Sequence, residues 1–251
     1  MFKALLARAR QGYRTAPYPV PDPSLPALFR GRPELDSESC ISGCSQCVDA
    51  CPTDALQITA SGLELDLGRC IFCGVCAAAC PDRAITFTRD WQLAVSERAS
   101  MVVTDDRRLH IDALGRDLRR LLGRSLRLRQ VSAGGCNGCE AEVNALSNVV
   151  FDSGRFGIEF VASPRHADGV LVTGPVTVNM KDALLKTYEA IAEPKLVIAA
   201  GACAISGGIF GGHEEVCNGI DDLLPVDLYV PGCPPHPFTI LDGLLRMLGR
   251  Y

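Results

Sequence analysis

Apolar and polar stretches alternate regularly through the second half of the chain. Short runs rich in Val, Ile and Leu are followed by longer stretches with apolar residues at helical spacing. They predict strands at Leu126–Val131, Ile158–Ala162, Gly169–Thr173, Leu196–Ala200 and Asp227–Val230, and helices at Glu140–Val149, Lys181–Ala192 and Phe238–Leu248. Strands that alternate with helices favour a mainly parallel sheet with helices on both faces. We therefore predict a flavodoxin-like α/β domain with an open parallel sheet at residues 125–251.

The chain before residue 125 lacks this alternation. Five prolines fall within ten residues, at Pro17, Pro19, Pro21, Pro23 and Pro26. Such spacing excludes a helix or a central strand, so we expect residues 1–35 to form an extended arm that lies on another part of the molecule. A disordered tail is the alternative.

A basic segment separates the two halves of the chain. Between Arg107 and Arg129 there are eight arginines and two aspartates, with leucines at helical spacing at Leu114, Leu118, Leu121 and Leu122. We predict a basic linker with a helix at residues 96–124. Two interpretations of its charge remain open, namely a solvated helix face and a docking face for an acidic partner subunit.

Composition adds limits on the class of protein. The chain has 251 residues, 47% of them hydrophobic and 22% charged, and a net charge of −4. This balance is that of a soluble globular protein and gives no indication of nucleic-acid binding. The longest apolar run, Leu196–Ile205, is broken by Gly201 and is too short for a membrane span. The first residues do not resemble a secretory signal. We therefore expect a cytoplasmic protein whose thirteen cysteines serve metal binding or catalysis.

Eight of these cysteines form two copies of one pattern. Cys47-x-x-x-Cys51-Pro52 recurs 29 residues later as Cys76-x-x-x-Cys80-Pro81. The second copy has the spacing of a bacterial iron–sulfur run, in which the cysteine before proline ligates the sister cluster. We predict a two-[4Fe–4S] ferredoxin domain of the α+β class at residues 36–95. Crossed ligation assigns one cluster to Cys40, Cys44, Cys47 and Cys80, and the other to Cys70, Cys73, Cys76 and Cys51.

The first copy departs from the pattern because three residues, not two, separate Cys40 from Cys44. We expect a loop bulge to accommodate the extra residue. The alternative is that Cys40 is a poor ligand and its cluster is labile.

Four further cysteines follow predicted strands of the second half, at Cys136, Cys139, Cys203 and Cys233. Open α/β sheets gather their ligands beyond the carboxyl ends of the strands, so these four thiols should converge. Four thiolates suit zinc or a [4Fe–4S] cluster, and the ferredoxin repeat in the same chain favours iron–sulfur. Cys217 is left over. We interpret it as a small buried apolar side chain, with a spare ligand or reactive thiol as the alternative.

Several motifs resemble known families. Residues 18 to 95, through FRGRPEL, LDLGRCIFCGVC and WQLAV, resemble the two-cluster ferredoxin subunit of formate hydrogenlyase and hydrogenase-4 complexes. Residues from about 121 onward resemble the small subunit of the same group 4 [NiFe]-hydrogenases, through GGCNGCEAEVNAL, SPRHAD and PGCPPHP. That subunit is related to the 20 kDa subunit of complex I. Complex I proteins have adjacent cysteines at the first ligand position, whereas Asn137 and Gly138 separate Cys136 from Cys139 here, as in the hydrogenases. The chain looks like two normally separate subunits fused.

The resemblance implies an electron relay through three [4Fe–4S] clusters. Electrons would pass to or from a nickel–iron site on a partner [NiFe]-hydrogenase-like large subunit, for proton reduction or hydrogen oxidation, and the chain would not be catalytic alone. Electron-input and membrane subunits, and a peripheral position on the cytoplasmic face of the inner membrane, are also implied. One alternative is a complex I-like or hydrogenase-related quinone oxidoreductase without nickel. Another is a free ferredoxin, which would not need the second half.

Three other positions are candidates for supporting roles. Glu140 follows Cys139 and is a candidate for proton transfer, because a carboxylate near a buried metal often has a raised pKa. The alternative is a carboxylate favoured by the helix dipole. Arg165 and His166 are candidates for hydrogen bonds to the third cluster, or for capping a loop. His213 and His236 are expected to be surface or structural histidines.

Overall fold

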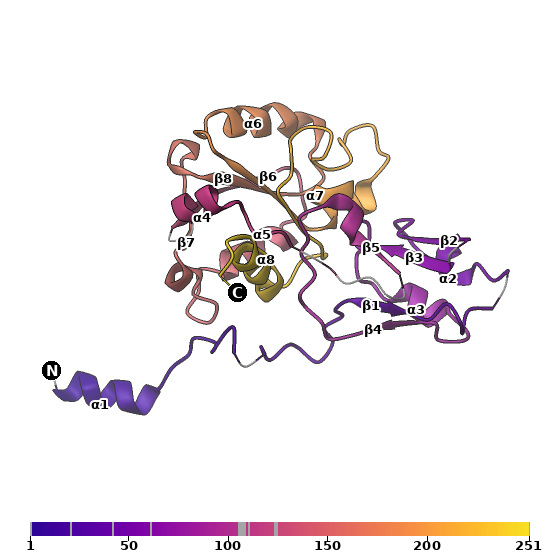
Figure 1. The fold of residues 1–251 in the computed structure, drawn as a ribbon, viewed down its shortest axis with the longest axis horizontal. Helices are drawn as coiled ribbons and strands as arrows, with labels where there is room; N and C mark the ends of the chain where they lie inside the picture. The colour runs from indigo at the N-terminus through magenta and orange to yellow at the C-terminus, as the bar shows by residue number, and fades with distance from the viewer. Residues whose placement is uncertain are drawn as a thin grey trace.

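The chain folds into a small α+β unit that lies beside a larger α/β unit, with one helix held apart from both (Figure 1). The computed structural model describes residues 2–20, 22–41, 43–60, 62–104, 109, 111–122 and 125–250. Within these residues, no helix combines the length and the apolar character needed to cross a bilayer.

The α+β unit is built from antiparallel strand pairs. Strand β1 pairs with β4, and β3 lies between β2 and β5 in a three-stranded sheet. Because β5 pairs with β3, the unit extends past residue 95. Its elements are β1 (Pro33–Leu35), α2 (Gln46–Asp49), β2 (Leu56–Thr59), β3 (Gly62–Asp66), α3 (Val75–Ala79), β4 (Ile85–Phe87), the 3₁₀ turn η1 (Arg98–Met101) and β5 (Val102–Val103).

The α/β unit has the predicted parallel sheet. Its five strands lie in the order β10-β9-β8-β6-β7, and all neighbours are parallel. The predicted strands and helices are confirmed, with β8 and β9 at the predicted bounds. The elements are β6 (Leu126–Ser132), α5 (Gly138–Ala145), η2 (Ser153–Phe156), β7 (Ile158–Phe160), η3 (Pro164–His166), β8 (Gly169–Thr173), α6 (Val178–Glu189), β9 (Leu196–Ala200), α7 (Ala202–Ser206), η4 (Gly208–Phe210), β10 (Leu228–Val230) and α8 (Pro237–Met247).

Both faces of the sheet are covered, which explains why the central strands are apolar at successive positions. On one face, side chains such as Val172 and Val197 pack with Leu184 of α6. The same apolar cluster continues into the α+β unit, where it includes Leu65 and Met101. The opposite face packs against α5 and α8, through residues that include Val143, Leu171, Ile198, Leu241 and Leu244.

The proline-rich arm is confirmed in part. Tyr18 is buried against Trp91, Phe156 and Phe238, so the arm does lie on the rest of the molecule. For residues 2–11 the prediction of an extended arm is wrong, because they form helix α1 (Phe2–Gln11). This segment has no proline and is rich in Ala, Leu and Arg, which are strong helix formers. Gly12, with a φ of +63°, follows the end of the helix.

The basic linker contains the predicted helix in a shorter form, α4 (Arg116–Leu122). Leu122 is buried, whereas Arg116 and Arg119 are exposed, which agrees with a solvated basic face. Arg107 lies outside the described residues. Docking of an acidic partner on this face stays a prediction.

A buried carboxylate joins three segments that are distant in sequence. Asp242 of α8 is 0% exposed and accepts hydrogen bonds from Tyr18 of the arm (3.4 Å), Gln92 (3.0 Å) and the Nε of Arg246 (2.7 Å). Burial raises the pKa of Asp242, and the Arg246 guanidinium opposes this shift. Asp242 therefore depends on its partners to remain ionised inside the protein.

We expect Asp242→Ala to lower the unfolding temperature by roughly 10 °C, because it leaves the Arg246 charge buried without its partner. Glu193→Ala is the matched control. It removes the ion pair between Glu193 and Lys195 (3.2 Å), and the Glu193 side chain is 76% exposed. The control should shift the unfolding temperature little. Differential scanning calorimetry under anoxic conditions checks both, and equal shifts would contradict the structural role of Asp242.

Candidate metal centres

The two cysteine repeats fold into two copies of one local structure. Cys47 lies in helix α2 and Cys76 in helix α3, and both are buried. A Cys–Pro turn follows each helix, and then a strand begins. The backbone N–H of Ala55 donates to the Sγ of Cys51 at 3.3 Å, and that of Ala84 donates to the Sγ of Cys80 at the same distance. Both copies of the sequence repeat therefore form the same hydrogen bond from a backbone N–H to the sulfur of the pre-proline cysteine.

Electrostatic interactions among these eight thiols agree with crossed pairing of the repeats, and Cys47 also acts on Cys76. Burial raises the pKa of Cys70 to about 12, and the nearby thiols of Cys76, Cys51 and Cys73 add to the effect. Cys51 thus acts on the thiols of the other repeat, as crossed ligation requires. We call Cys51, Cys70, Cys73 and Cys76 group 2.

The other group is crossed in the same way. Burial raises the pKa of Cys40, and the thiols of Cys44 and Cys80 raise it further. The pKa of Cys47 is also raised, first by burial and then by Cys80. We call Cys40, Cys44, Cys47 and Cys80 group 1. The extra residue of the first repeat falls in a turn where the Cys44 N–H donates to the Ile41 carbonyl at 3.1 Å. Ser42 lies outside the described residues.

Group 3 consists of Cys136, Cys139, Cys203 and Cys233, beyond the carboxyl ends of β6, β9 and β10. Burial raises the pKa of Cys139 to about 12, and the thiols of the other three members contribute. Burial likewise raises the pKa of Cys203 to about 11. Cys139 and Cys203 lie in α5 and α7, the helices that follow β6 and β9. The four residues converge at one edge of the sheet.

Two glycines make room for the sulfurs of group 3. A Cβ at Gly201 would lie 2.5 Å from the Sγ of Cys139, and a Cβ at Gly208 would lie 2.9 Å from the Sγ of Cys203. Both glycines have positive φ, +94° and +56°, which disfavours a side chain there. The backbone can therefore approach this group closely.

The donor sets fit iron–sulfur clusters. Each group offers four thiols, and soft sulfur donors select iron–sulfur clusters, zinc or copper(I). Within the described residues, no group of three or more His, Cys, Asp or Glu side chains closes on a single metal ion. A cubane binds one sulfur at each of four irons and so spaces its ligands more widely than one ion does. Thiols with raised pKa values carry protons at neutral pH, so metal loading must release them.

Groups 2 and 3 lie next to each other. The Cys73 thiol is among the charges that act on Cys233, whose pKa is raised mainly by burial. A cleft of about 230 Å³ lies beside them, lined by Ile71 and Phe72 from the α+β unit and by Cys233 and Pro234 from the α/β unit. Cys47 of group 1 also acts on Cys76 of group 2, so group 2 has a neighbour in each of the other two groups.

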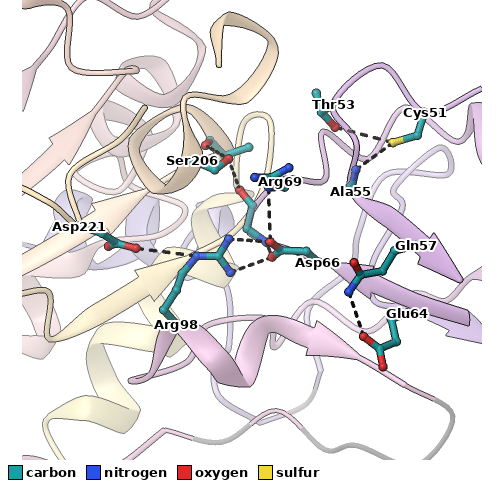
Figure 2. Close-up of polar contacts among 12 residues, drawn as sticks. Cys51, Thr53, Ala55, Gln57, Glu64, Asp66, Arg69, Arg98, Ser206 and Asp221 are labelled. Carbon is teal, nitrogen blue, oxygen red and sulfur yellow. Dashed lines mark hydrogen bonds and ion pairs between the residues drawn. The ribbon is translucent and has the colours of Figure 1, made fainter. Parts of the chain in front are cut away.

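A polar network fixes this arrangement across the two units (Figure 2). The Arg98 guanidinium donates to both carboxylate oxygens of Asp66, at 2.8 and 2.6 Å, and its Nε lies 3.8 Å from Asp221. Asp66 accepts from the Gly68 N–H at 2.8 Å, and the Gly68 carbonyl accepts from the Ser206 hydroxyl at 2.9 Å. Gly68 precedes Cys70 and Ser206 follows Cys203, so the network ties together the loops of groups 2 and 3.

Glu140 is buried, but its expected raised pKa is wrong. Burial tends to raise the pKa of Glu140. The hydroxyls of Ser132 (2.6 Å) and Thr173 (2.7 Å) donate hydrogen bonds to its carboxylate and lower the pKa, and the resulting pKa lies below the ordinary value for a glutamate. The carboxylate joins β6 to β8 behind group 3. This geometry favours a structural anion, and proton transfer through Glu140 stays an untested prediction.

The other predicted positions make no hydrogen bond to the thiols of group 3 in the described part of the chain. Arg165 and His166 are exposed in η3, and among the described residues no hydrogen bond joins either side chain to group 3. The expected hydrogen bonds to a cluster thus gain no support. His213 and His236 are structural as predicted, because the Nδ1 of each accepts a nearby backbone N–H. Cys217 packs against the core that covers the α6 face, which agrees with a small apolar side chain.

One sequence feature indicates residues that contact the thiols, and one cross-unit contact has no local signal. Ala55 and Ala84 occupy equivalent places in the repeats, four residues after Cys51 and Cys80, and their N–H groups bind sulfur. Arg98 lies after the second copy of the repeat, and nothing local indicates its partner Asp221, which is distant in sequence.

Comparisons with known proteins agree with this division of the chain. Residues 39–84 match the model of the 4Fe-4S dicluster domain, and residues 136–247 match that of the NADH ubiquinone oxidoreductase 20 kDa subunit.

Three relatives illustrate the similarity. Formate hydrogenlyase subunit 7 of Escherichia coli is 45% identical over 55% of this chain, and the match covers 54% of that protein, about half its length. A protein of Pyrococcus furiosus described as a probable membrane-bound hydrogenase subunit, mbhJ, is 43% identical over 52% of this chain and 78% of its own length. NAD(P)H-quinone oxidoreductase subunit K of a Picosynechococcus species is 48% identical over 43% of this chain and 45% of its own length.

We expect Gly201→Ala to remove about four irons per chain from anoxically purified protein, because its Cβ would displace the Cys139 sulfur. Gly115→Ala is the matched control, since a Cβ there meets nothing within 4 Å. Iron analysis and electron paramagnetic resonance (EPR) spectra measure the loss. Full iron content in Gly201→Ala would show that this close approach is not needed for loading.

Proposed function

Because this chain belongs to the family of the NADH ubiquinone oxidoreductase 20 kDa subunit and also carries a 4Fe-4S dicluster domain, we propose that it is the electron-transfer subunit of a hydrogenase-4-like or complex I-like membrane complex. It is a subunit of an oxidoreductase. The observation that carries the proposal is that the thiols interact as three groups of four would require, since Cys51 acts on Cys70, Cys80 acts on Cys40 and Cys47, and the other three thiols of group 3 act on Cys139.

Each group is proposed to hold one [4Fe–4S] cluster, and a bound cluster supplies one-electron transfer at a potential set by its surroundings. The chain's own residues provide those surroundings. Backbone N–H groups of Ala55, Phe72 and Ala84 donate to ligand sulfurs at 3.3 Å. Such donors stabilise added negative charge, so they favour the reduced state of groups 1 and 2.

The proposed path runs from group 1 through group 2 to group 3. Its support is the proximity of Cys73 to Cys233 and the network of Arg98, Asp66 and Ser206 that holds their loops. The pre-proline cysteines link the two repeats, because Cys51 of the first repeat belongs to group 2 and Cys80 of the second repeat belongs to group 1. The chain thus positions three redox sites with one continuous core.

The proposed partner is a [NiFe]-hydrogenase-like large subunit that covers group 3. Cys136 and Cys233 are exposed, so this edge of the sheet is open to a partner. Cys217 alone lies outside the three groups, so this chain has no pair of spare cysteines to hold nickel. The two residues between Cys136 and Cys139 favour the hydrogenase type. Further electron-input and membrane subunits, and a place on the cytoplasmic face of the membrane, are part of the same proposal.

A quinone oxidoreductase of the complex I type, without nickel, is the second candidate. It is favoured by the 48% identity to the NAD(P)H-quinone oxidoreductase subunit. The geometry of groups 1 to 3 serves both candidates equally, because each needs the same relay. The partner's metal content separates them.

The proposal also includes the domain organisation. We assign residues 36–95 with their extension through β5 to the ferredoxin domain, and residues 125–251 to a flavodoxin-like domain. The strand order supports the second assignment, since the first strand of this domain, β6, lies between the second and third, β7 and β8.

The ligand assignment predicts about twelve irons per chain in anoxically purified protein. Cys139→Ala should lose about four of them, together with one cluster signal in EPR spectra. Cys217→Ser is the matched control and should keep full iron content. Iron loss in the control, or an unchanged spectrum in Cys139→Ala, would refute the assignment of group 3.

The hydrogenase form of the proposal predicts that nickel co-purifies with this chain. The intact complex, isolated anoxically through a tag on this chain, should contain a large subunit with two Cys-x-x-Cys pairs. Hydrogen gas should then reduce the EPR-visible clusters, and Cys139→Ala should block reduction of groups 1 and 2. A nickel-free complex whose reduced clusters are reoxidised by a quinone analogue would establish the second candidate instead.

A further inference from the structure

Helix α1 is exposed on every side. None of its ten residues is buried, and Phe2 and Leu5 are 80% and 62% exposed. Figure 1 shows the helix held apart from both folded units. A helix of this length is marginal in water on its own, so a surface outside the chain is needed to stabilise it.

The helix is amphipathic. At 3.6 residues per turn, Phe2, Leu5, Leu6 and Ala9 fall on one face. Lys3, Arg8 and Arg10 lie along the two borders of this face, and the side opposite it carries Ala7 and Gln11. The apolar residues therefore form a single stripe between flanking basic side chains.

The charge of this region is opposite to that of the whole chain. Up to residue 21 there are four basic residues, at Lys3, Arg8, Arg10 and Arg14, and no acidic ones, whereas the whole chain has a net charge of −4. The surface that complements this helix is therefore both apolar and anionic. The interface of an anionic bilayer has both properties, because its headgroups carry negative charge and its acyl chains are apolar.

We propose that α1, with Tyr13, lies in the headgroup region of an anionic phospholipid bilayer. Tyr13 is 79% exposed just past the helix, and the Arg8 guanidinium lies 4.5 Å from the centre of its ring. Aromatic and basic side chains of this kind favour the membrane interface. This inference goes beyond the electron relay and does not depend on it, because no cysteine lies in the segment.

The helix is linked to the body at a defined point. The Ala16 N–H donates to the Val150 carbonyl at 2.8 Å, and Arg155 donates to the Ala16 carbonyl at 2.8 Å. Between this anchor and α1 lie only residues 12–15, which begin with Gly12. A short tether of this kind holds the body beside the bilayer while its core and thiol groups stay in the aqueous phase.

The test is flotation of the full anoxically purified chain with lipid vesicles. One set contains equal parts of phosphatidylglycerol and phosphatidylcholine, and the other contains phosphatidylcholine alone. Leu5→Glu with Leu6→Glu disrupts the apolar stripe, and Ala7→Glu with Gln11→Glu makes the same change of charge on the opposite side. Iron content, measured on every sample, reports the clusters independently of vesicle binding.

We expect the unmodified chain to float with the anionic vesicles only, and less so at high salt. The stripe variant should bind about tenfold more weakly or worse, and the control variant should lose less. No flotation of the unmodified chain, or equal binding by both variants, would overturn the proposal. Loss of a protein subunit from the complex in the stripe variant, without flotation of the unmodified chain, would assign the helix to a protein partner instead.

Discussion

Desolvation of thiols is the constraint on which the rest of the structure depends. A thiol at Cys139 or Cys70 that holds its proton up to about pH 12 is poorly suited to be a ligand until a metal compensates the buried charge. Neighbouring residues favour this replacement of the thiol proton by a metal. Gly201 lets the backbone approach, N–H groups face sulfur, and Cys51 and Cys80 cross between repeats so that each group closes only when both repeats are folded.

The two units form one molecule through polar contacts as well as through a shared core. Val95 and Tyr229 exchange backbone hydrogen bonds at 3.0 and 2.9 Å, which adds a bridge between the end of the ferredoxin unit and the last strand of the sheet. Arg98, through Asp221, and Asp242, through Gln92, act at separate places along the same boundary. Since groups 2 and 3 face each other across it, these contacts fix the geometry of their closest approach.

Local signals predicted most of the fold, and contacts between distant segments account for the rest. The apolar runs of β8 and β9 and the cysteine spacing were sufficient because each depends on neighbours in sequence. Helix α1 was missed because the prolines that follow it dominated the interpretation of the whole arm. The lowered pKa of Glu140 could not be foreseen, since it arises from hydroxyls of Ser132 and Thr173 on two different strands.

The boundary between the units is modest in its polar part, with the Arg98–Asp221 ion pair, one bridge and a few hydrogen bonds. Two free proteins would need more than this to stay together at low concentration, because association costs translational and rotational freedom. The covalent connection after β5 removes that cost by keeping the halves at a high effective concentration. Covalent linkage therefore fixes a one-to-one stoichiometry and leaves the boundary free to be shaped by electron-transfer geometry rather than by affinity.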